Sequence, residues 1–390
     1  MKKENKLKEV AKVFFKLGLF AFGGPAAHIA MMEEEVVNKR KWMSRQHYLD
    51  LIGSTNLIPG PNSTEMTMHC GHERAGFKGL LVAGVSFIFP AVITTGLLAY
   101  VYTEYGELPN IKPFFYGIKP AVLAVIASAI FKLGKKAIKG WELAVFGSLV
   151  LVLSIVGINE IVVLLGTGIM GAFYFYTKHK VSTSTKSVLP LFLLNIGIGG
   201  VSKLTTLNVF LTFLKVGSIL YGSGYVLFAY LKVELVETGL MTNQQLLDAI
   251  AMGQFTPGPV LSTATFIGYQ LTGIWGALAA SVGIFLPSFL FVLLLNPLIP
   301  RMQRSKFLRG FLDSVNVAAV GIMIAVLFTM ARDTIFPELV INDLIIERLF
   351  DWKALLIASV SATLVFGFKK INVMWTILGG AFLGFALSFI

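Results

Sequence analysis

The chain of 390 residues is 55% apolar and only 14% charged, and its mean hydropathy is +0.76. Soluble domains carry about 25% charged residues, so this composition excludes an ordinary soluble protein. Apolar runs of about 18 or more residues predict an all-α polytopic membrane protein embedded in the lipid bilayer. The net charge of +12 lies in short loops between these runs, where it sets orientation, and so does not indicate a nucleic-acid partner. The single cysteine and the spacing of the five histidines predict no metal site and no cofactor.

The apolar runs form two sets, one in each half of the chain. The first covers residues 13–32, 79–102, 114–133, 143–158 and 161–176, and the second covers 207–236, 274–299, 310–330, 354–368 and 373–390. The polar stretch 178–187 and the short apolar run 188–201 lie between the two sets. The number of full membrane spans stays open by two or three.

The first run is interrupted in its middle by Gly23-Gly24-Pro25. Proline removes a backbone donor and glycine tolerates unusual dihedrals, so a helix is expected to break there. The run is either a bent span or a re-entrant hairpin. The lysine-rich N-terminus and the basic loop 39–41 both favour the cytoplasm, and this favours the hairpin.

The next break is a Pro-Gly-Pro corner, Pro59-Gly60-Pro61. Such a triplet usually marks a surface turn. The flanking arms, 48–58 and 62–71, each reach only about 16 Å, whereas the hydrocarbon core is about 30 Å thick. The corner also returns as Pro257-Gly258-Pro259, 198 residues later. We therefore expect each corner to be the tip of a re-entrant helical hairpin inside the membrane, where it must face protein or water.

The corner is one member of an internal repeat. Lys16 matches Lys215 at an offset of 199, Asp50 matches Asp248 at 198, and Pro90 matches Pro287 at 197. A drift of two residues over this length requires only one or two small deletions. We therefore predict two homologous halves: an N-terminal repeat (1–180), a linker with a short apolar segment (181–205) and a C-terminal repeat (206–390).

The loop charges predict that the halves face opposite sides of the membrane. The loop near residue 134 in the first half carries four lysines, whereas its counterpart around residues 333–351 is mainly acidic. Conversely, residues 104–110 carry no Lys or Arg, whereas their counterpart holds Arg301, Arg304, Lys306 and Arg309. Short basic loops stay cytoplasmic, so the chain is expected to be an inverted-topology repeat, as in many secondary transporters.

The corners have the chemistry of an anion site, because helix N-termini carry partial positive charge and unpaired N–H groups. Two helices would begin at the corners and point their N-termini at each other. The side chains there would supply further donors, although local helix capping is an equally ordinary role for them. The predicted substrate-binding residues are Asn56, Pro59, Gly60, Pro61, Ser63 and Thr64, with Gln254, Pro257, Gly258, Pro259, Ser262 and Thr263.

Lys16 and Lys215 occupy equivalent places inside apolar runs and join the predicted substrate site. A charge at membrane depth costs several kcal/mol unless it is paired or hydrated, which makes it a functional candidate. The alternative, chiefly for Lys16, is that the side chain extends to the membrane–water interface. For proton coupling, the candidates are the matched acids Glu35 and Glu234 and the matched acids Asp50 and Asp248. Glu35 is more simply a helix cap. Glu65 stands opposite Ala264 or Thr263 and breaks the symmetry.

No G-x-x-x-x-G-K-[ST] segment is present, so direct ATP drive is not expected. No catalytic triad pattern survives the comparison of the two halves, so the chain is not expected to be an enzyme.

The motifs resemble the long, two-domain form of the chromate ion transporter family. The resemblance rests on Phe22-Gly23-Gly24-Pro25-Ala26-Ala27-His28, Trp42, the first corner, Gly71-x-x-x-Ala75-Gly76-x-x-Gly79, Phe87-x-Phe89-Pro90, Gly253-Gln254-x-x-Pro257-Gly258-Pro259 and Phe285-Leu286-Pro287. It covers nearly the whole chain. The break residues Gly23, Gly24, Pro25, His28, Gly222 and Ser223 join the candidate site. Because Ser223-Gly224 replaces Gly24-Pro25 and His28 has no counterpart, a strictly symmetric site is in doubt.

The resemblance implies export of chromate, with sulfate as an analogue, driven by the proton-motive force across the inner (plasma) membrane. We therefore expect a secondary active transporter for a tetrahedral oxyanion, in the membrane as a multi-pass chain, with a second copy of the chain as a candidate partner in a homodimer. The alternatives are an anion channel, a transporter of another small anion, or an intramembrane enzyme.

Overall fold

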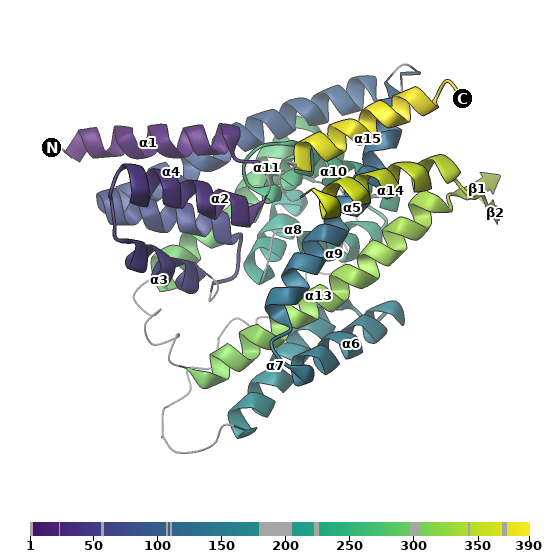
Figure 1. Ribbon diagram of the computed structural model, residues 1–390. Coiled ribbons are helices and arrows are strands. Elements are labelled where there is room, and N and C mark those ends of the chain that lie inside the picture. The colour runs from purple at the N-terminus through teal and green to yellow at the C-terminus, as the bar shows by residue number, and fades with distance from the viewer. Residues whose placement is uncertain are drawn as a thin grey trace.

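The computed structural model describes residues 3–22, 24–55, 58–106, 108–109, 111–178, 205–221, 226–295, 305–341, 344–368 and 373–390 (Figure 1). The first half comprises α1 (Lys3–Phe20), α2 (Pro25–Glu33), the π-helical turn η1 (Glu34–Lys39), α3 (Arg45–Thr55), α4 (Asn62–Tyr105), α5 (Lys112–Ala137), α6 (Trp141–Ile155) and α7 (Glu160–Lys178).

The second half repeats this order. It comprises α8 (Thr206–Ile219), α9 (Leu227–Leu231), the π-helical turn η2 (Lys232–Val236), α10 (Asn243–Phe255), the 3-10 turn η3 (Val260–Ser262), α11 (Thr263–Leu295), α13 (Lys306–Ile335), α14 (Trp352–Gly367) and α15 (Val373–Leu387). The predicted linker lies almost wholly outside the described residues.

Five segments among the described residues are long and apolar enough to cross a membrane: α4, α5, α7, residues Val260–Leu294 and α13. Shorter apolar helices, among them α6, α14 and α15, lie beside them. α13 packs against α5, α6 and α7, and α15 packs against α5, so the last three helices of each half form one block. The chain is therefore an all-α, multi-pass membrane protein, as its composition predicts.

The internal repeat is visible in the backbone. α4 is kinked at Ala75 (φ −142°, ψ 18°) and Gly76 (φ 65°, ψ −154°), and α11 is kinked at Thr272 (φ −143°, ψ 29°) and Gly273 (φ 67°, ψ −152°). The two kinks lie 197 residues apart. In each half, a π-helical turn also follows the second short helix. This agreement in dihedral angles confirms the duplication.

The first run is a hairpin, not a bent span. α1 ends at Phe20, and α2 begins at Pro25 after Gly24, whose φ of 79° turns the chain. η1 then lies back against α1, with Lys16 Nζ 3.7 Å from Glu35 Oε1. α3 and α4 form a second hairpin, because His47 Nε2 lies 3.2 Å from Glu73 Oε2. Both hairpins therefore begin and end at the same end of the molecule.

The two halves are inverted. The part of α4 that follows its kink runs from the base of the first half's hairpins, where their helices begin and end, to the base of the second half's corner hairpin. Gly76 lies at the base of the first half's hairpins, and at the far end of α4 the Tyr102 hydroxyl donates to Asp248 in α10 over 2.5 Å. Asp248 belongs to the arm by which the second half's corner hairpin starts. The base of the second half's hairpin thus lies at the opposite end of the molecule.

The structure contains a two-stranded β-hairpin that the sequence did not predict. Within the acidic loop after α13, β1 (Glu338–Ile341) pairs antiparallel with β2 (Leu344–Arg348), with a register shift between Leu339 and Val340. β-branched residues favour such pairing, but the strands are too short to show a clear alternation in the sequence. They lie beyond the long helices and do not alter the helical fold.

Candidate functional site

The two Pro-Gly-Pro corners hydrogen-bond to opposite halves. The Gly60 N–H donates to Leu220 O over 2.6 Å, and the Gly258 N–H donates to Ala21 O over 2.9 Å. Gly60 matches Gly258 at 198 and Leu220 matches Ala21 at 199, so one contact is the image of the other. Each corner therefore touches the end of the first helix of the other half, and the tips of all the hairpins gather at the pseudo-two-fold axis.

Both corner glycines need φ values that other residues avoid, 139° for Gly60 and 86° for Gly258. Both also lie close to the opposite half. A Cβ at Gly60 would lie 2.5 Å from Ser288 Oγ of α11, and a Cβ at Gly258 would lie 2.8 Å from Ala91 Cβ of α4. Ser288 and Ala91 again match, at 197. The close approach of the halves at the corners thus depends on glycine.

The hydroxyls beside the corners differ between the halves. Ser63 and Thr64 are buried in the first turn of α4, and Thr64 Oγ1 has no hydrogen-bond partner. In the second half, the Thr263 hydroxyl donates to Val260 O over 2.8 Å, and Ser262 Oγ lies 3.4 Å from Thr256 Oγ1. The second-half hydroxyls of Ser262 and Thr263 are thus used in local contacts, whereas Thr64 in the first half keeps a buried hydroxyl without a partner among the described residues.

Two further predicted residues lie in this region. His28 in α2 is buried and its Nε2 lies 3.1 Å from Ala21 O, the same carbonyl that accepts from Gly258, while its Nδ1 has no partner. Gln254 at the end of α10 is buried, and its Nε2 lacks an acceptor. Buried polar atoms are nearly always hydrogen-bonded, so a cluster without partners indicates a place for a ligand or water. The predicted residues Gly23, Asn56, Gly222 and Ser223 lie outside the described residues.

Lys16 and Lys215 lie away from the corners and are ion-paired in the same way. Lys215 Nζ lies 2.6 Å from Glu234 Oε1, and Lys16 Nζ lies 3.7 Å from Glu35 Oε1. The Lys16 side chain is 64% exposed and faces a cavity of about 330 Å³ between α1 and α2. The two lysines and two glutamates therefore form one motif that is repeated in both halves.

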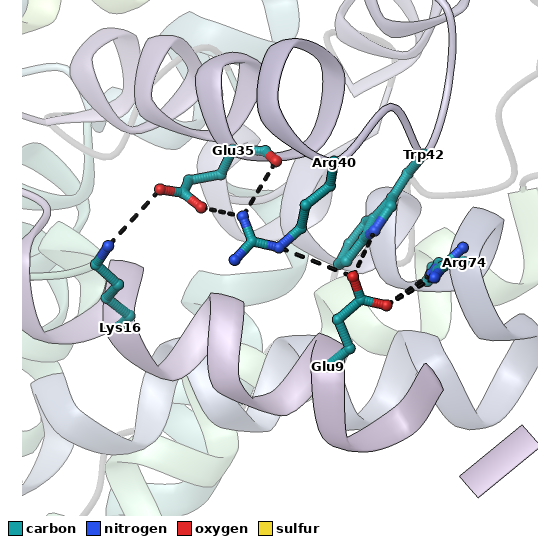
Figure 2. A network of polar contacts seen from close by, with 6 residues as sticks. All are labelled: Glu9, Lys16, Glu35, Arg40, Trp42 and Arg74. Atoms are coloured by element: carbon teal, nitrogen blue, oxygen red, sulfur yellow. Dashed lines mark hydrogen bonds and ion pairs between the residues drawn. The ribbon is translucent and has the colours of Figure 1, made fainter. Parts of the chain in front are cut away.

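The Lys16–Glu35 pair belongs to a network at the base of the first half's hairpins (Figure 2). Arg40 lies between two acids, pairing with Glu35 and approaching Glu9 Oε1 at 3.8 Å. Arg74 also pairs with Glu9, at 2.7 Å. Burial would raise the pKa of Glu35, but hydrogen bonds and charge from Lys39 and Arg40 outweigh it and hold the pKa below its ordinary value. Glu35 is thus held as a carboxylate.

The second half has no such network in the described residues. The positions that match Glu9 and Arg74 hold Asn208 and Leu271, and Leu240 matches Trp42. These three residues line one small, mainly apolar void. At the positions that match Glu9, Trp42 and Arg74, the second half thus has mainly apolar packing where the first half has charges.

Comparison with known proteins decides the family. The chromate transporter family model matches residues 8–172 and 207–385, one match in each half. The chain belongs to the chromate transporter family. A probable chromate transport protein of Synechococcus elongatus is 29% identical over 356 residues, which are 89% of this chain and 90% of that protein. A chromate transport protein of Cupriavidus metallidurans is 28% identical over 386 residues, 97% of this chain and 92% of that protein.

An uncharacterized transporter of Bacillus subtilis, YwrB, matches only 46% of this chain but over 93% of its own length, at 25% identity. A protein of about half the length thus corresponds to part of the duplicated chain. No solved structure matches. These relatives indicate a membrane transporter.

The transporter also contains a large cavity at the end of the molecule away from the Glu9 network. It has a volume of about 1010 Å³ and is lined by residues of α4, α5, α10 and α15. Lys119 Nζ of α5 lies 3.0 Å from Asp248 Oδ1 inside it, and the hydroxyl of Tyr116 donates to Asp351 over 2.5 Å. Lys112 and Lys353 also line this cavity. The cavity thus combines cationic and acidic side chains in a space large enough for a hydrated anion.

Asp50 and Asp248, which the sequence pairs, are in different environments. Asp248 is buried and bonded to Lys119 and Tyr102. Asp50 is exposed, and its carboxylate accepts from Gln46 over 3.1 Å. Sequence reasoning did not place Lys119 or Tyr102 in a site. The available signal was the position of Lys119 inside an apolar run, opposite Asn316 in the repeat.

Proposed function

We propose that this chain is a secondary active transporter that carries chromate, or a similar tetrahedral oxyanion such as sulfate, out of the cytoplasm across the plasma membrane, coupled to the proton gradient. Chromate is the leading substrate because the relatives from Synechococcus elongatus and Cupriavidus metallidurans carry that substrate in their names. The observation that carries the mechanism is the reciprocal contact of the two corners, Gly60 to Leu220 and Gly258 to Ala21.

A tetrahedral dianion suits this arrangement because it needs donors from several directions to replace its hydration. The helical segments that follow the corners begin after Pro61 and Pro259 in inverted halves, and each corner touches the other half, which supports a shared site at their N-termini. Thr64, His28 and Gln254 retain atoms without partners in that region. We place the anion there, with the other predicted corner and break residues around it, and assign Lys16 and Lys215 to the paths toward it. The two halves would then rock about the anion to open it to each side in turn.

The membrane potential supplies the driving force for efflux, because an accompanying proton would move outward against a pH gradient that is acid outside. Moving one elementary charge through 100 mV changes the free energy by about 2.3 kcal/mol. A dianion that leaves together with one proton still carries one negative charge outward. A potential that is negative inside therefore favours efflux of the oxyanion even when a proton accompanies it.

The test uses purified protein in liposomes. Chromate and sulfate fluxes are followed with radioactive tracers under an imposed potassium diffusion potential and an imposed pH gradient. The proposal predicts saturable flux that responds to both gradients. Flux that does not saturate and ignores the pH gradient would identify a channel, and no flux of either oxyanion would overturn the proposed substrate class.

A further inference from the structure

Glu65 is the one carboxyl group that faces a Pro-Gly-Pro corner among the described residues. It lies in the first turn of α4 and is completely buried. Both of its carboxyl oxygens lack a hydrogen-bond partner among the described residues. A Cβ at Gly60 would collide with Glu65 Oε1, so the carboxyl group rests directly against the corner. The same added Cβ would lie 2.5 Å from Ser288 Oγ of α11, which also has no hydrogen-bond partner among the described residues.

In the part of the chain that the structure describes, no cationic side chain pairs with Glu65. The phenol of Tyr221, at the break after α8, is the titratable group from another element that interacts electrostatically with it. His69 follows one turn later on α4 and is itself buried, with Nε2 unpartnered. Gly60, against which the carboxyl group lies, and Ser288, which also approaches Gly60 from α11, carry no charge. Leaving a carboxylate buried without a donor or a cation costs several kcal/mol, so the group is neutral in this arrangement.

We propose that Glu65 is the proton-binding residue of the transport cycle, and that it carries its proton whenever an anion occupies the corners. This inference rests on the proposed function. An ionised Glu65 would repel a dianion in the same dry space, whereas the neutral carboxyl can donate its O–H to an oxyanion oxygen. Proton and anion therefore occupy the site together and leave on the same side of the membrane.

The other acids are held in different states. Glu35, Glu234 and Asp248 are ion-paired, and Asp50 is exposed. In the second half, Thr263 stands where Glu65 stands in the first, and its hydroxyl is committed to Val260 O. Among the described residues, Glu65 is thus the buried acid at a corner whose carboxyl oxygens have no partner, which assigns one proton to each transport cycle at this site.

The experiment measures the pH dependence of anion affinity in liposomes, with tracer exchange as the readout. We compare the wild type with Glu65→Gln, Glu65→Asp and, as a matched control, Glu73→Gln, which alters an exposed acid of the same helix. In the wild type, anion affinity falls by up to about tenfold per pH unit once Glu65 begins to ionise. We expect Glu65→Gln to remove this dependence and the stimulation of uptake by an inward proton gradient, and Glu65→Asp and Glu73→Gln to keep both.

A wild-type pH dependence in Glu65→Gln would overturn the assignment, as would uptake driven by a sodium gradient and not by a proton gradient. Infrared spectroscopy gives a second readout that needs no transport. A band from a protonated carboxyl group at pH 8 should be present in the wild type and absent from Glu65→Gln. Its absence from the wild type contradicts the inference. Failure of the wild type to exchange any oxyanion would instead remove the proposed function and leave the infrared result to decide the protonation of Glu65.

Discussion

The corner glycines are constrained in two ways, by their backbone conformation and by close contact with the other half. Gly60 and Gly258 combine a positive φ with close neighbours from the other half, whereas Gly239 has a φ of 74° and nothing within 4 Å of an added Cβ. Strain at such a φ is expected at all three positions. Only the two corner glycines also hold the halves together.

Replacing Gly60 or Gly258 by alanine should therefore inactivate transport and lower the thermal stability of the purified protein. Backbone strain alone costs about 1–3 kcal/mol, and the collision with Ser288 or Ala91 adds to it. Gly239→Ala serves as the control and should lose stability without losing transport. Thermal unfolding in detergent and tracer flux in liposomes measure the two effects. Normal transport by both corner variants would show that the close approach is dispensable.

The pair Lys215–Glu234 allows a structural role to be separated from anion binding. Lys215→Met leaves the mostly buried Glu234 carboxylate unpaired, so stability and anion affinity should both fall. In the double variant Lys215→Met/Glu234→Gln, the unpaired charge is removed. We expect the melting temperature to recover and the anion affinity, measured by tracer competition, to stay at least tenfold weaker. Recovery of the affinity in the double variant would mean that Lys215 is only a structural partner of Glu234.

At the scale of elements, much of the hairpin architecture could be predicted from the sequence. The breaks at Gly23–Pro25 and at the two corners follow from the local chemistry of glycine and proline, and the arm lengths exclude full spans. The kinks at Gly76 and Gly273 and the β1–β2 pair were not predicted. A kink with a single residue at positive φ leaves the apolar pattern on both sides intact, and strands of four or five residues carry little periodicity.

The kinks provide an element-scale prediction. Gly76 and Gly273 have φ near 65° with nothing within 4 Å of an added Cβ, so alanine there meets strain but no collision. With ψ values of −154° and −152°, both lie in a region that is adopted almost only by glycine, and another residue there costs about 1–3 kcal/mol. Gly76→Ala and Gly273→Ala should each lower the unfolding temperature by a similar amount, because the two kinks are equivalent. Gly166→Ala and Gly379→Ala, at open positions without positive φ, are the controls and should not destabilise. Unequal losses at the two kinks would contradict their equivalence.

At the scale of the whole molecule, the duplication and its inversion could be read from motif offsets and loop charges. The contacts between halves could not. The ion pair Lys119–Asp248 joins residues 129 positions apart in different halves, and neither periodicity nor charge pattern identifies such partners. The surroundings of Glu65 likewise include Tyr221, and Ser288 approaches the same corner, and only the folded arrangement brings these residues there.

The inversion predicts opposite labelling of matched positions. Lys135 at the end of α5 and Arg332 at the end of α13 are exposed and lie 197 residues apart. Single cysteines are introduced at each position in a background in which Cys70, which is buried, provides little reactivity. A membrane-impermeant maleimide added to intact cells should label Arg332→Cys and spare Lys135→Cys. Labelling of both from the same side would contradict the inverted repeat.

The central claim is that one oxyanion binds where the two corners meet. Selenate is a tetrahedral dianion that scatters anomalously, so a crystal of the full chain grown with selenate would locate the site directly. The account predicts one anomalous peak between residues 60–64 and 258–263, close to the pseudo-two-fold axis. A peak confined to the Lys119–Asp248 cavity or beside Lys16, with none at the corners, would contradict it.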